Sequence, residues 1–381
     1  MRDGWKKLHV GDLGRIVTGK TPKTAIIENY GGNIPFLTPS DDLSTKRVKR
    51  TIKTITEKGL SEVKNCLLPP HSVCVSCIGS DLGKVVVTTH PTVTNQQINS
   101  IVPNSNFDYN FIYYAMTILG ETLNHISKTS TAVPIVNKTS FSNYTVLVPS
   151  LPEQRAIAAT LACLDDKIEL NNKINANLEA QAQAIFKSWF VDFEPFQNGE
   201  FVDSELGMIP RGWRVGKLEE LITVKYGKDH KKLADGLIPV FGSGGIMRYA
   251  EKSLYEKESV LIPRKGTLNN VLYINEPFWT VDTMFYSEMK QNNIAKYIYH
   301  FISNKDLASM NAGSAVPSMT TEILNNISVL VAPDLVFTEF EQLLAPLFKL
   351  KKHNEVQSRT LTALRDALLP KLMSGEIEVP V

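Results

Sequence analysis

The chain has 381 residues, of which 43% are hydrophobic, and this is enough to form two ordinary cores. It carries 41 Lys and Arg against 39 Asp and Glu, a formal net charge of +2, so charge alone does not indicate a nucleic-acid partner. The first residues show no apolar run behind a basic stretch, and no apolar segment reaches a membrane-spanning length. We therefore expect a soluble, cytoplasmic protein without a signal peptide.

The two halves of the chain repeat each other. The Gly-Trp pair at residues 4–5 returns at residues 212–213, an offset of 208 (212 minus 4). Residues 131–134 return as residues 314–317, an offset of 183 (317 minus 134) that then holds without a gap into the following helical segments. Because the middles of the halves differ in length and content, the sequence predicts one scaffold that presents two different reading surfaces. Such a protein suits a target with two unlike half-sites.

Residues 14–21 match the phosphate-binding loop pattern G-x-x-x-x-G-K-T. That loop must follow a buried strand and open directly into a helix. Here Pro22 follows at once and cannot supply an amide, and the residues before Gly14 are too polar for a central strand. A P-loop enzyme remains an alternative: nucleotide titration would reveal the binding, and Lys20→Ala should then abolish it.

Basic residues concentrate early in each half. Residues 1–70 hold 13 Lys and Arg against 7 Asp and Glu, with a dense run at residues 46–50, and a second cluster occupies residues 225–232. A solvated charged face is the alternative explanation for either cluster. Because both clusters fall in the diverged part of the repeat, we expect local phosphate contacts in spite of the near-neutral total.

Cys74 and Cys77 form a C-x-x-C pair. A structural zinc site needs a second pair of ligands, which the remaining cysteines and the nearby His71 do not supply at finger spacing. We therefore predict buried strand cysteines and no metal site.

Polar turns occur at matching places in the two halves. A loop follows an Ile-Pro pair at residues 34–41 and 238–245, and an apolar strand runs into a polar turn at residues 77–84 and 264–270. Farther on, residues 94–97 align with residues 281–284 at an expected offset of 187 (281 minus 94). Arg and Lys suit guanine edges, Asn and Gln suit adenine, and Ser and Thr suit either a base or a phosphate.

The predicted DNA-binding residues come from these turns and from the basic clusters. They are Lys20, Lys23, Ser40, Ser80, Lys84, Asn95, Gln96, Gln97, Lys228, Lys231, Ser243, Arg264, Lys265, Thr267, Asn269 and Asn270. Arg264 and Lys265 are the best candidates of the second half. Asn95, Gln96 and Gln97 could equally stabilise turns.

Each repeat ends in a long helical segment. The first opens at residues 150–153, Ser-Leu-Pro-Glu, which is typical of a capping box with proline in the first turn. The predicted seam residues are Ile157, Leu161, Leu164, Ile168, Asn171, Leu178, Ile185, Phe340, Leu344, Leu347, Asn354, Leu361 and Leu368. This heptad spacing favours two helices paired antiparallel, with Asn171 and Asn354 satisfying each other at the centre. The alternative is two amphipathic helices, each packed on its own domain.

A helix pair of this length would act as a ruler. At 1.5 Å per residue, 35 residues make a rod of about 50 Å. Such a rod would hold two domains on DNA one or more helical turns apart, each turn being about 34 Å.

No catalytic set emerges from the sequence. Residues 68–71, Leu-Pro-Pro-His, lack the polar lead residue and the aromatic residue of a base methyltransferase loop. Pro333-Asp334 lacks the Asp/Glu-x-Lys sequel of a metal-dependent nuclease, and no two histidines stand at ligand spacing. The sequence therefore predicts a binding protein and not an enzyme.

Several longer motifs together resemble a known family. They are the Gly-Trp openings, SLPEQ at residues 150–154, KSWFVDF at 187–193, SELGMIPRGW at 204–213 and LMSGEI at 372–377. With the two-repeat layout, they resemble the specificity subunit of type I restriction–modification systems over essentially the whole chain. The second helix departs from the pattern, because it opens with Pro-Asp-Leu at residues 333–335 instead of Pro-Glu-Gln, and the first repeat lacks a Leu-Gly-x-Ile-Pro lead.

The resemblance implies an α+β fold with pseudo-twofold duplication. Two similar mixed α/β target recognition domains would be separated by two long conserved helices that form an antiparallel coiled coil. The expected segments are a first recognition domain (1–150), a first spacer helix (151–190), a connector (191–206), a second recognition domain (207–332), a second spacer helix (333–374) and a tail (375–381).

The resemblance also implies the partners. The chain would bind a bipartite, asymmetric site on double-stranded DNA and dock two modification subunits and the restriction subunits. It would bind no cofactor itself, since S-adenosylmethionine, ATP and Mg²⁺ are expected on those partners. A third alternative is a coiled-coil scaffold without a DNA role, which neutralising Arg264 and Lys265 would test.

Overall fold

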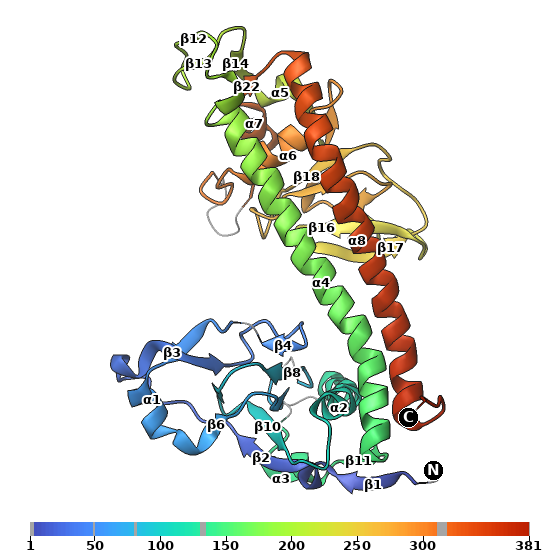
Figure 1. Ribbon diagram of the computed structural model, residues 1–381. Helices are drawn as coiled ribbons and strands as arrows, with labels where there is room; N and C mark the ends of the chain where they lie inside the picture. The colour runs from blue at the N-terminus through green and yellow to red at the C-terminus, as the bar shows by residue number, and fades with distance from the viewer. Residues whose placement is uncertain (1–3, 49, 80–81, 130–134, 311–317, 381) are drawn as a thin grey trace. The chain divides into compact units, whose positions relative to one another are not determined.

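The computed structural model describes residues 4–48, 50–79, 82–129, 135–310 and 318–380, which fall into two compact units (Figure 1). The first unit is Met1–Asn171 with Glu355–Val381, and the second is Asn172–Asn354. The borders between the units lie inside the two long helices, so each helix contributes one half to each unit. No helix in the described part of the chain is long and apolar enough to cross a membrane.

The first unit contains two sheets and a separate strand pair. Its strands are β1 (Lys6–His9), β2 (Gly14–Thr18), β3 (Tyr30–Leu37), β4 (Arg47–Val48), β5 (Lys53–Ile55), β6 (Leu67–Leu68), β7 (Val73–Ser76), β8 (Val85–Thr88), β9 (Thr92–Thr94), β10 (Ile98–Pro103) and β11 (Thr145–Val148). The larger sheet has the order β2-β10-β7-β8-β4 and the smaller one β5-β3-β9-β6, while β1 pairs with β11. Within these mixed sheets, β4 runs parallel to β8 and β3 runs parallel to β9.

Three shorter helices complete the first unit: α1 (Glu57–Glu62), α2 (Tyr109–Thr129) and α3 (Lys138–Asn143). Phe111, Ile112 and Met116 of α2 share a core with both valines of β7 and with Val85 and Val87 of β8. Both strands are buried along their whole length, with side chains of β7 on both faces in apolar clusters. A continuous run of β-branched residues such as Val-Val-Val-Thr in β8 suits a strand that is covered on both faces.

The second unit repeats this architecture with smaller sheets. Its strands are β12 (Phe201–Val202), β13 (Ile209–Pro210), β14 (Arg214–Lys217), β15 (Ile222–Tyr226), β16 (Ile238–Gly242), β17 (Gly245–Ala250), β18 (Ser259–Pro263), β19 (Leu272–Ile274), β20 (Trp279–Thr280), β21 (Met284–Met289) and β22 (Ser328–Val331). Its sheets have the orders β15-β21-β18-β19 and β17-β16-β20, with β14 paired to β22 and β12 to β13. The helices are α5 (Leu218–Leu221), α6 (Ala295–Ser303) and α7 (Thr321–Asn325). The prediction of two similar mixed α/β domains is confirmed.

The two units share the register of their first and last strands. Lys6 of β1 lies opposite Val148 of β11, and Arg214 of β14 lies opposite Val331 of β22. These partners are related by 208 (214 minus 6) and by 183 (331 minus 148), which are the offsets of the sequence repeat. The duplication therefore extends to the hydrogen-bonding register of these strand pairs.

The middle of the repeat needs a correction of one residue. The amide of Asn95 donates to the carbonyl of Leu37, and the amide of Val281 donates to the carbonyl of Phe241, both at 3.0 Å. Asn95 therefore corresponds to Val281, an offset of 186 (281 minus 95) instead of the expected 187. The segment that leads into this turn is also shorter in the second unit, with 40 residues from Phe241 to Val281 (281 minus 241) against 58 from Leu37 to Asn95 (95 minus 37).

The same offset relates α2 to α6. The amide of Ile112 donates to Asp108 at 3.0 Å, and the amide of Ile298 donates to Ile294 at 2.8 Å, again 186 residues apart (298 minus 112). However, α2 has 21 residues and α6 has 9. Helices α2 and α6 therefore begin at equivalent places and differ in length.

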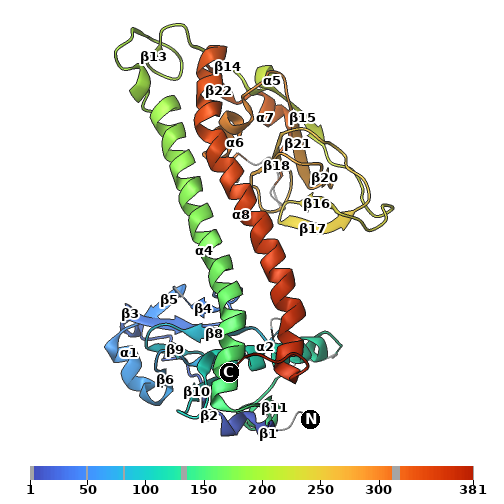
Figure 2. The ribbon, with the colours of Figure 1, turned by 45° about the vertical axis from the view of Figure 1, so that its right-hand side comes forward.

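The long helices α4 (Leu151–Phe190) and α8 (Asp334–Ser374) pack together in each unit, as predicted (Figure 2). In the first unit, Asp165 of α4 accepts from Arg365 of α8 at 2.8 Å, and Asn171 donates to Ser358 at 3.2 Å. A later residue of α4 thus meets an earlier residue of α8, so the helices are antiparallel.

The second unit shows the same order. Asn354 donates to Asn175 at 2.9 Å, and farther along α4 the ring of Phe186 lies 6.4 Å from that of Phe340. Because Ser358 corresponds to Asn175 (358 minus 175 is 183), Asn171 and Asn354 make equivalent bonds within their own units. A direct bond between these two asparagines stays a prediction.

All thirteen predicted seam residues are buried or half-buried. At the outer ends, Ile157 and Leu161 join the core that contains α2, and Phe340 and Leu344 join the core that contains α6. The two arrangements considered from the sequence are therefore both present: the ends of the helices pack on the domains, and the centre pairs helix with helix.

The remaining alternatives from the sequence can now be assessed. Residues 14–18 of the P-loop match form β2, and the amide of Lys20 donates to the carbonyl of Thr94 at 2.9 Å instead of opening a helix. Cys74 lies in β7 and Cys77 just beyond it, and both are buried, as predicted. Burial raises the pKa of Cys74 to about 12 and that of Cys77 to about 11, so both thiols stay protonated. No group of three metal-ligating side chains occurs among the described residues.

Candidate nucleic-acid interface

In the second unit, one edge of a sheet, where β15 ends, has a position that only glycine can occupy. Gly227 follows β15, and a Cβ there would lie 2.0 Å from the carbonyl oxygen of Val281. This close approach lets the amide of Lys228 donate to Thr280 at 2.8 Å, while the indole of Trp279 donates to the carbonyl of Lys228 at 2.9 Å. The backbone of Lys228 is thus fixed and its side chain is exposed.

Arg264 is held over this edge by two contacts. Its guanidinium lies 5.3 Å from the centre of the Tyr226 ring, and its Nη1 donates to the carbonyl of Asp282 at 3.1 Å. A cation stacked on an aromatic ring keeps its planar fork of donors in one orientation. Within the described residues, this is the single hydrogen bond of the Arg264 side chain, so the other N–H groups can face a ligand. A bidentate arginine of this kind is the commonest reader of guanine.

Polar loop residues gather beside Arg264. The side-chain amide of Asn270 donates to the carbonyl of Ser243 at 2.8 Å. Gly266 has a φ of +83°, and a Cβ there would lie 2.9 Å from the Ser243 hydroxyl. The structure therefore brings together Ser243, Arg264 and Asn270, three of the predicted DNA-binding residues; we call them, with Tyr226, the Arg264 cluster.

The Arg264 cluster contains one exposed ring, that of Tyr226, and an exposed apolar side chain, that of Met247, lies beside the cluster. Met247 of β17 is 59% exposed and Tyr226 is 51% exposed. A Cβ at Gly242, the residue before Ser243, would lie 2.6 Å from the Met247 sulfur, so Met247 adjoins the cluster. Apolar side chains next to a stacked arginine suit a base edge that carries a methyl group, such as thymine.

The other predicted residues of the second half differ in their surroundings. Asn269 donates to Asp306 at 3.3 Å and accepts from the amide of Ala308 at 3.1 Å, so it ties down a neighbouring loop. Lys265 is half-buried and forms a backbone bridge with Ser318. Thr267 and Lys231 are exposed.

The first unit has the same edge with different side chains. Gly19 follows β2, and a Cβ there would lie 2.2 Å from the carbonyl oxygen of Asn95, as at Gly227. Lys20 is exposed, as Lys228 is. Next to it, the hydroxyl of Thr21 donates to the Gln96 side chain at 2.7 Å. Lys20 and Gln96 are thus brought to one exposed edge.

Asn95 and Gln97 stabilise the turn at this edge. The side-chain amide of Asn95 donates to Gln97 Oε1 at 2.8 Å, and Asn95 Oδ1 accepts from the amide of Gln97 at 3.1 Å. Asn95 is buried. These contacts favour the turn-stabilising alternative for both residues and leave Gln96 as the exposed member of the three.

The decisive difference between the edges lies at two positions. Arg264 corresponds to Cys77, because their amides make the same bond, to Thr283 at 2.9 Å and to Gln97 at 2.8 Å. Cys77 is buried, and the position of Tyr226 is taken in the first unit by Thr18, which pairs with β10 as Tyr226 pairs with β21. The same backbone arrangement therefore carries a stacked arginine in the second unit and a buried cysteine at the equivalent position of the first.

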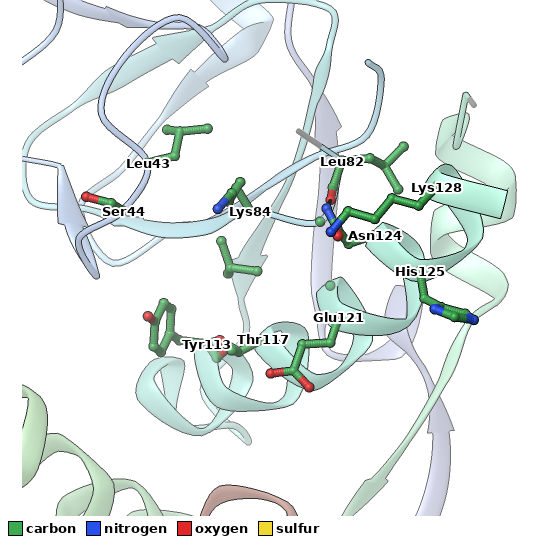
Figure 3. Close-up of a pocket in the computed structure, with 13 residues that line it drawn as sticks. Leu43, Ser44, Leu82, Lys84, Tyr113, Thr117, Glu121, Asn124, His125 and Lys128 are labelled. Carbon is green, nitrogen blue, oxygen red and sulfur yellow. Dashed lines mark hydrogen bonds between the residues drawn. The ribbon is translucent and has the colours of Figure 1, made fainter. Parts of the chain in front are cut away.

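A groove of about 690 Å³ lies on the first unit between α2 and the turn before β8. Figure 3 shows Lys84 from this turn and Lys128 from α2 along the groove, with Glu121 lining its helical wall. The helix approaches the turn closely, since a Cβ on Gly83 or Gly120 would lie 2.1 Å from the carbonyl oxygen of the other. Two ammonium groups on one groove suit phosphate oxygens, although Glu121 offsets part of the charge.

The first two residues of the basic run at residues 46–50 make contacts inside the first unit, whereas Arg50 is exposed and Lys49 lies outside the described residues. Lys46 is buried and donates to the hydroxyl of Tyr114 at 3.1 Å. Arg47 lies 2.8 Å from Asp166 and 2.9 Å from Glu169, both on α4. Lys46 and Arg47 therefore contribute to the packing of the first unit. The sequence pattern could not reveal this, because their partners lie far along the chain.

The remaining predicted residues are Lys23 and Ser40, which are exposed, and Ser80, which lies outside the described residues. The amide of Lys23 donates to Glu62 at 2.8 Å, so its backbone is anchored.

Comparison with known proteins identifies the family to which this chain belongs. A family model for the type I restriction modification DNA specificity domain matches residues 2–180 and again residues 210–334. The chain belongs to this family. It is a non-catalytic DNA specificity subunit of a type I restriction–modification system.

Relatives of this specificity subunit match over its whole length. It is 29% identical over 408 residues to the type I restriction enzyme MjaIX specificity subunit of Methanocaldococcus jannaschii, with 98% of this chain and 94% of that one covered. It is 22% identical to the HindI specificity subunit of Haemophilus influenzae, with 98% and 99% covered. The crystal structure of the type I system S subunit from M. genitalium matches with a TM-score of 0.61 and 17% identity over 98% of this chain and 97% of that one, which supports the fold.

Proposed function

We propose that this specificity subunit reads a bipartite, asymmetric DNA sequence, one half-site with each unit. The observation that carries the proposal is the pair of equivalent edges that differ at Cys77 and Arg264. Two readers built on one frame with unlike side chains suit two unlike half-sites. The domain boundaries expected from the sequence remain part of this proposal.

Contacts to bases and to phosphates are divided between different residues in this proposal. Ser243, Arg264 and Asn270 contact bases in the second half-site, and Gln96 contacts a base in the first. Lys20, Lys84 and Lys228 contact phosphates, because exposed lysines act as point charges without base selectivity. The other predicted DNA-binding residues are not assigned to a base or a phosphate in this proposal: Lys23, Ser40, Ser80, Asn95, Gln97, Lys231, Lys265, Thr267 and Asn269.

The paired helices set the distance between the half-sites and dock the other subunits. Two modification subunits that use S-adenosylmethionine to methylate adenine, and restriction subunits that use ATP and Mg²⁺, are the partners that the family resemblance implies. The antiparallel packing of α4 and α8 within each unit supports a defined spacer.

Selection from random duplex DNA tests the proposal. The chain would be co-expressed with its modification subunits, and bound DNA would be sequenced. Two short, unlike motifs at a fixed gap are expected. A single contiguous motif would contradict the two-reader arrangement, and no enrichment would favour the scaffold alternative.

Exchange of the first recognition domain sharpens the test. Replacing residues 1–150 with the first domain of another family member should change one half of the selected sequence and leave the other half and the gap unchanged. A change in both halves, or in neither, would contradict independent readers.

A further inference from the structure

A pocket of about 420 Å³ opens in the second unit beside the C-terminal end of α4. Phe190 of α4, Phe301 of α6 and Leu330 of β22 contribute its walls. Val191 and Leu206 also line it, and they are 55% and 49% exposed. Large apolar side chains that stay exposed around a hollow mark an interaction site.

The first unit has a pocket of about 320 Å³ beside the C-terminal end of α8. Its walls come from Met373 of α8, from Ala115 of α2 and from Leu147 of β11. The lining of this pocket is again mainly apolar. The pocket lies where α8, α2 and β11 meet, as the pocket of the second unit lies where α4, α6 and β22 meet.

The two pockets occupy equivalent positions in the repeat. Met373 corresponds to Phe190 and Leu330 to Leu147 at an offset of 183, and Phe301 corresponds to Ala115 at an offset of 186 (301 minus 115). These are the offsets fixed by the strand register and by the first turns of α2 and α6. The reading edges have diverged around this frame, whereas the hollow is present in both units.

The polar lining differs between the pockets. Lys187 and Lys305 line the pocket of the second unit, where the first unit has Pro370 and Leu119. The ammonium of Lys305 lies 4.7 Å from the centre of the Phe301 ring, next to the apolar floor. Lys187 is already paired with Asp192, so Lys305 is the cation that a ligand carboxylate would meet. The second pocket therefore suits an apolar side chain that is accompanied by a carboxylate, and the first suits the apolar side chain alone.

We propose that the two pockets are paired anchor points for one partner protein that binds this subunit twice, each copy inserting the same large apolar side chain with a carboxylate beside it. This rests on the proposed function, in which the two modification subunits are that partner. Two identical copies need two similar receptors on one chain, and the duplicated pocket provides them. The residues that dominate binding at an interface typically insert one large side chain into such a pocket.

Filling each pocket separately tests the proposal. Thr145 and Ser328 are equivalent strand residues (328 minus 145 is 183), and each lines its own pocket. Thr145→Trp and Ser328→Trp would be made in the full chain, co-expressed with the modification subunits and examined by native mass spectrometry. The wild-type complex should carry two copies of the partner, each single variant one copy, and the double variant none.

Matched controls separate blockage from misfolding. Ser61→Trp adds the same side chain at an exposed position of α1 that lines neither pocket, and it should keep both copies. If a tryptophan variant lowers the unfolding midpoint, Thr145→Leu and Ser328→Leu fill less volume and should still raise the dissociation constant at that pocket at least about tenfold, a loss of about 1.4 kcal/mol. Lys305→Ala should weaken binding at the second pocket and leave the first unchanged.

The outcomes distinguish this inference from the proposed function. If every folded variant retains both copies with unchanged affinity, the pockets are not anchors, while the proposed function stands. If the wild-type complex does not hold two copies, or does not select a two-part DNA sequence, the proposed function itself fails.

Discussion

Equivalent residues of α2 and α6 have different surroundings in the two units. Tyr114 of α2 corresponds to His300 of α6 (300 minus 114 is 186), and both are buried. The hydroxyl of Tyr114 donates to Asp165 of α4 at 2.5 Å and accepts from Lys46 at 3.1 Å. Arg365 of α8 donates to the other oxygen of Asp165 at 2.8 Å. The first unit thus attaches α2 to the long helices through charged and polar groups.

His300 lies among aromatic rings instead. Its ring stacks on Phe186 at 5.7 Å and meets Phe348 edge-on at 5.9 Å. Phe348 takes the position that Asp165 has in the first unit (348 minus 165 is 183), and His300 Nδ1 lies 3.0 Å from Gln183 Oε1. One scaffold position therefore accepts either a charged network or an aromatic cluster.

The difference teaches how each attachment responds to change. Burial lowers the pKa of Lys46 to about 8, although Asp165 opposes the shift. Keeping Lys46 charged at neutral pH therefore costs free energy. The contrast concerns the Tyr114 and His300 position alone, because α6 has a buried charge of its own, Lys296, which pairs with Glu341 of α8. A charged network is also more sensitive to the loss of one member, because the remaining charges stay buried without a partner.

The largest expected effect breaks the charged attachment. Asp165→Ala removes the carboxylate shared by Tyr114 and Arg365 and should destabilise the first unit by about 3–5 kcal/mol, as for other broken buried ion pairs. Denaturant-induced unfolding of this subunit in its complex with the modification subunits would measure the loss of stability. Asp166→Ala is the matched control, since its side chain is 54% exposed, and it should cost less than about 1 kcal/mol. Equal losses in the two variants would contradict the role of Asp165.

The second prediction concerns the aromatic attachment and pH. Burial lowers the pKa of His300 from 6.5 to about 4. Below pH 6.5 the unfolded chain binds a proton that the folded unit does not bind until about pH 4. The stability of the second unit should therefore fall as the pH is lowered through this window and then level off, by up to about 3 kcal/mol.

His300→Phe tests that assignment. The variant has no titrating group at this position, so unfolding measured between pH 7 and pH 4 should lose this part of the slope. Its stability at pH 7 should stay within about 1.5 kcal/mol of wild type, because the replacement keeps a flat apolar ring of similar size. An unchanged slope would show that another group titrates.

The third prediction separates the readers. Arg264→Ala should cost about 1–3 kcal/mol of DNA affinity and relax selectivity at one position of one half-site, because a stacked arginine reads one base pair. Competition binding with single-base variants of the selected site would measure it. Arg211→Ala, an exposed arginine paired with Glu200, is the control and should leave selectivity unchanged. Relaxation in both half-sites would argue against separate readers.

The smallest expected effect is shared by both units. Lys20→Ala and Lys228→Ala remove exposed lysines at equivalent edges, so each should weaken DNA binding about equally for all sequences. The slope of log K against log salt should fall by about one in each variant. A change of base preference in either variant would show a base contact instead.

The sequence predicts the scaffold better than the readers, for physical reasons. The seam of α4 and α8 is a local pattern with helical spacing, and the paired outer strands lie in the part of the repeat with constant offsets. The role of Lys46 depends on Tyr114 and Asp165, which are distant in sequence, and nothing around residue 46 reveals them. The equivalence of Tyr114 and His300 is not apparent at the offset of 187 that the polar turns predict. Alignment of the buried positions of α2 and α6 at 186 would reveal it.

The pairing of β1 with β11, and of β14 with β22, has an evolutionary consequence. Each pairing places the first and last strands of a recognition domain side by side, with Lys6 opposite Val148 and Arg214 opposite Val331. The chain therefore enters and leaves each reader at one spot, immediately before a long helix begins. Recombination between related genes at these two strands would replace a whole reader and leave the helices untouched. A new DNA address could thus arise in one genetic event, without a stepwise change of individual contacts.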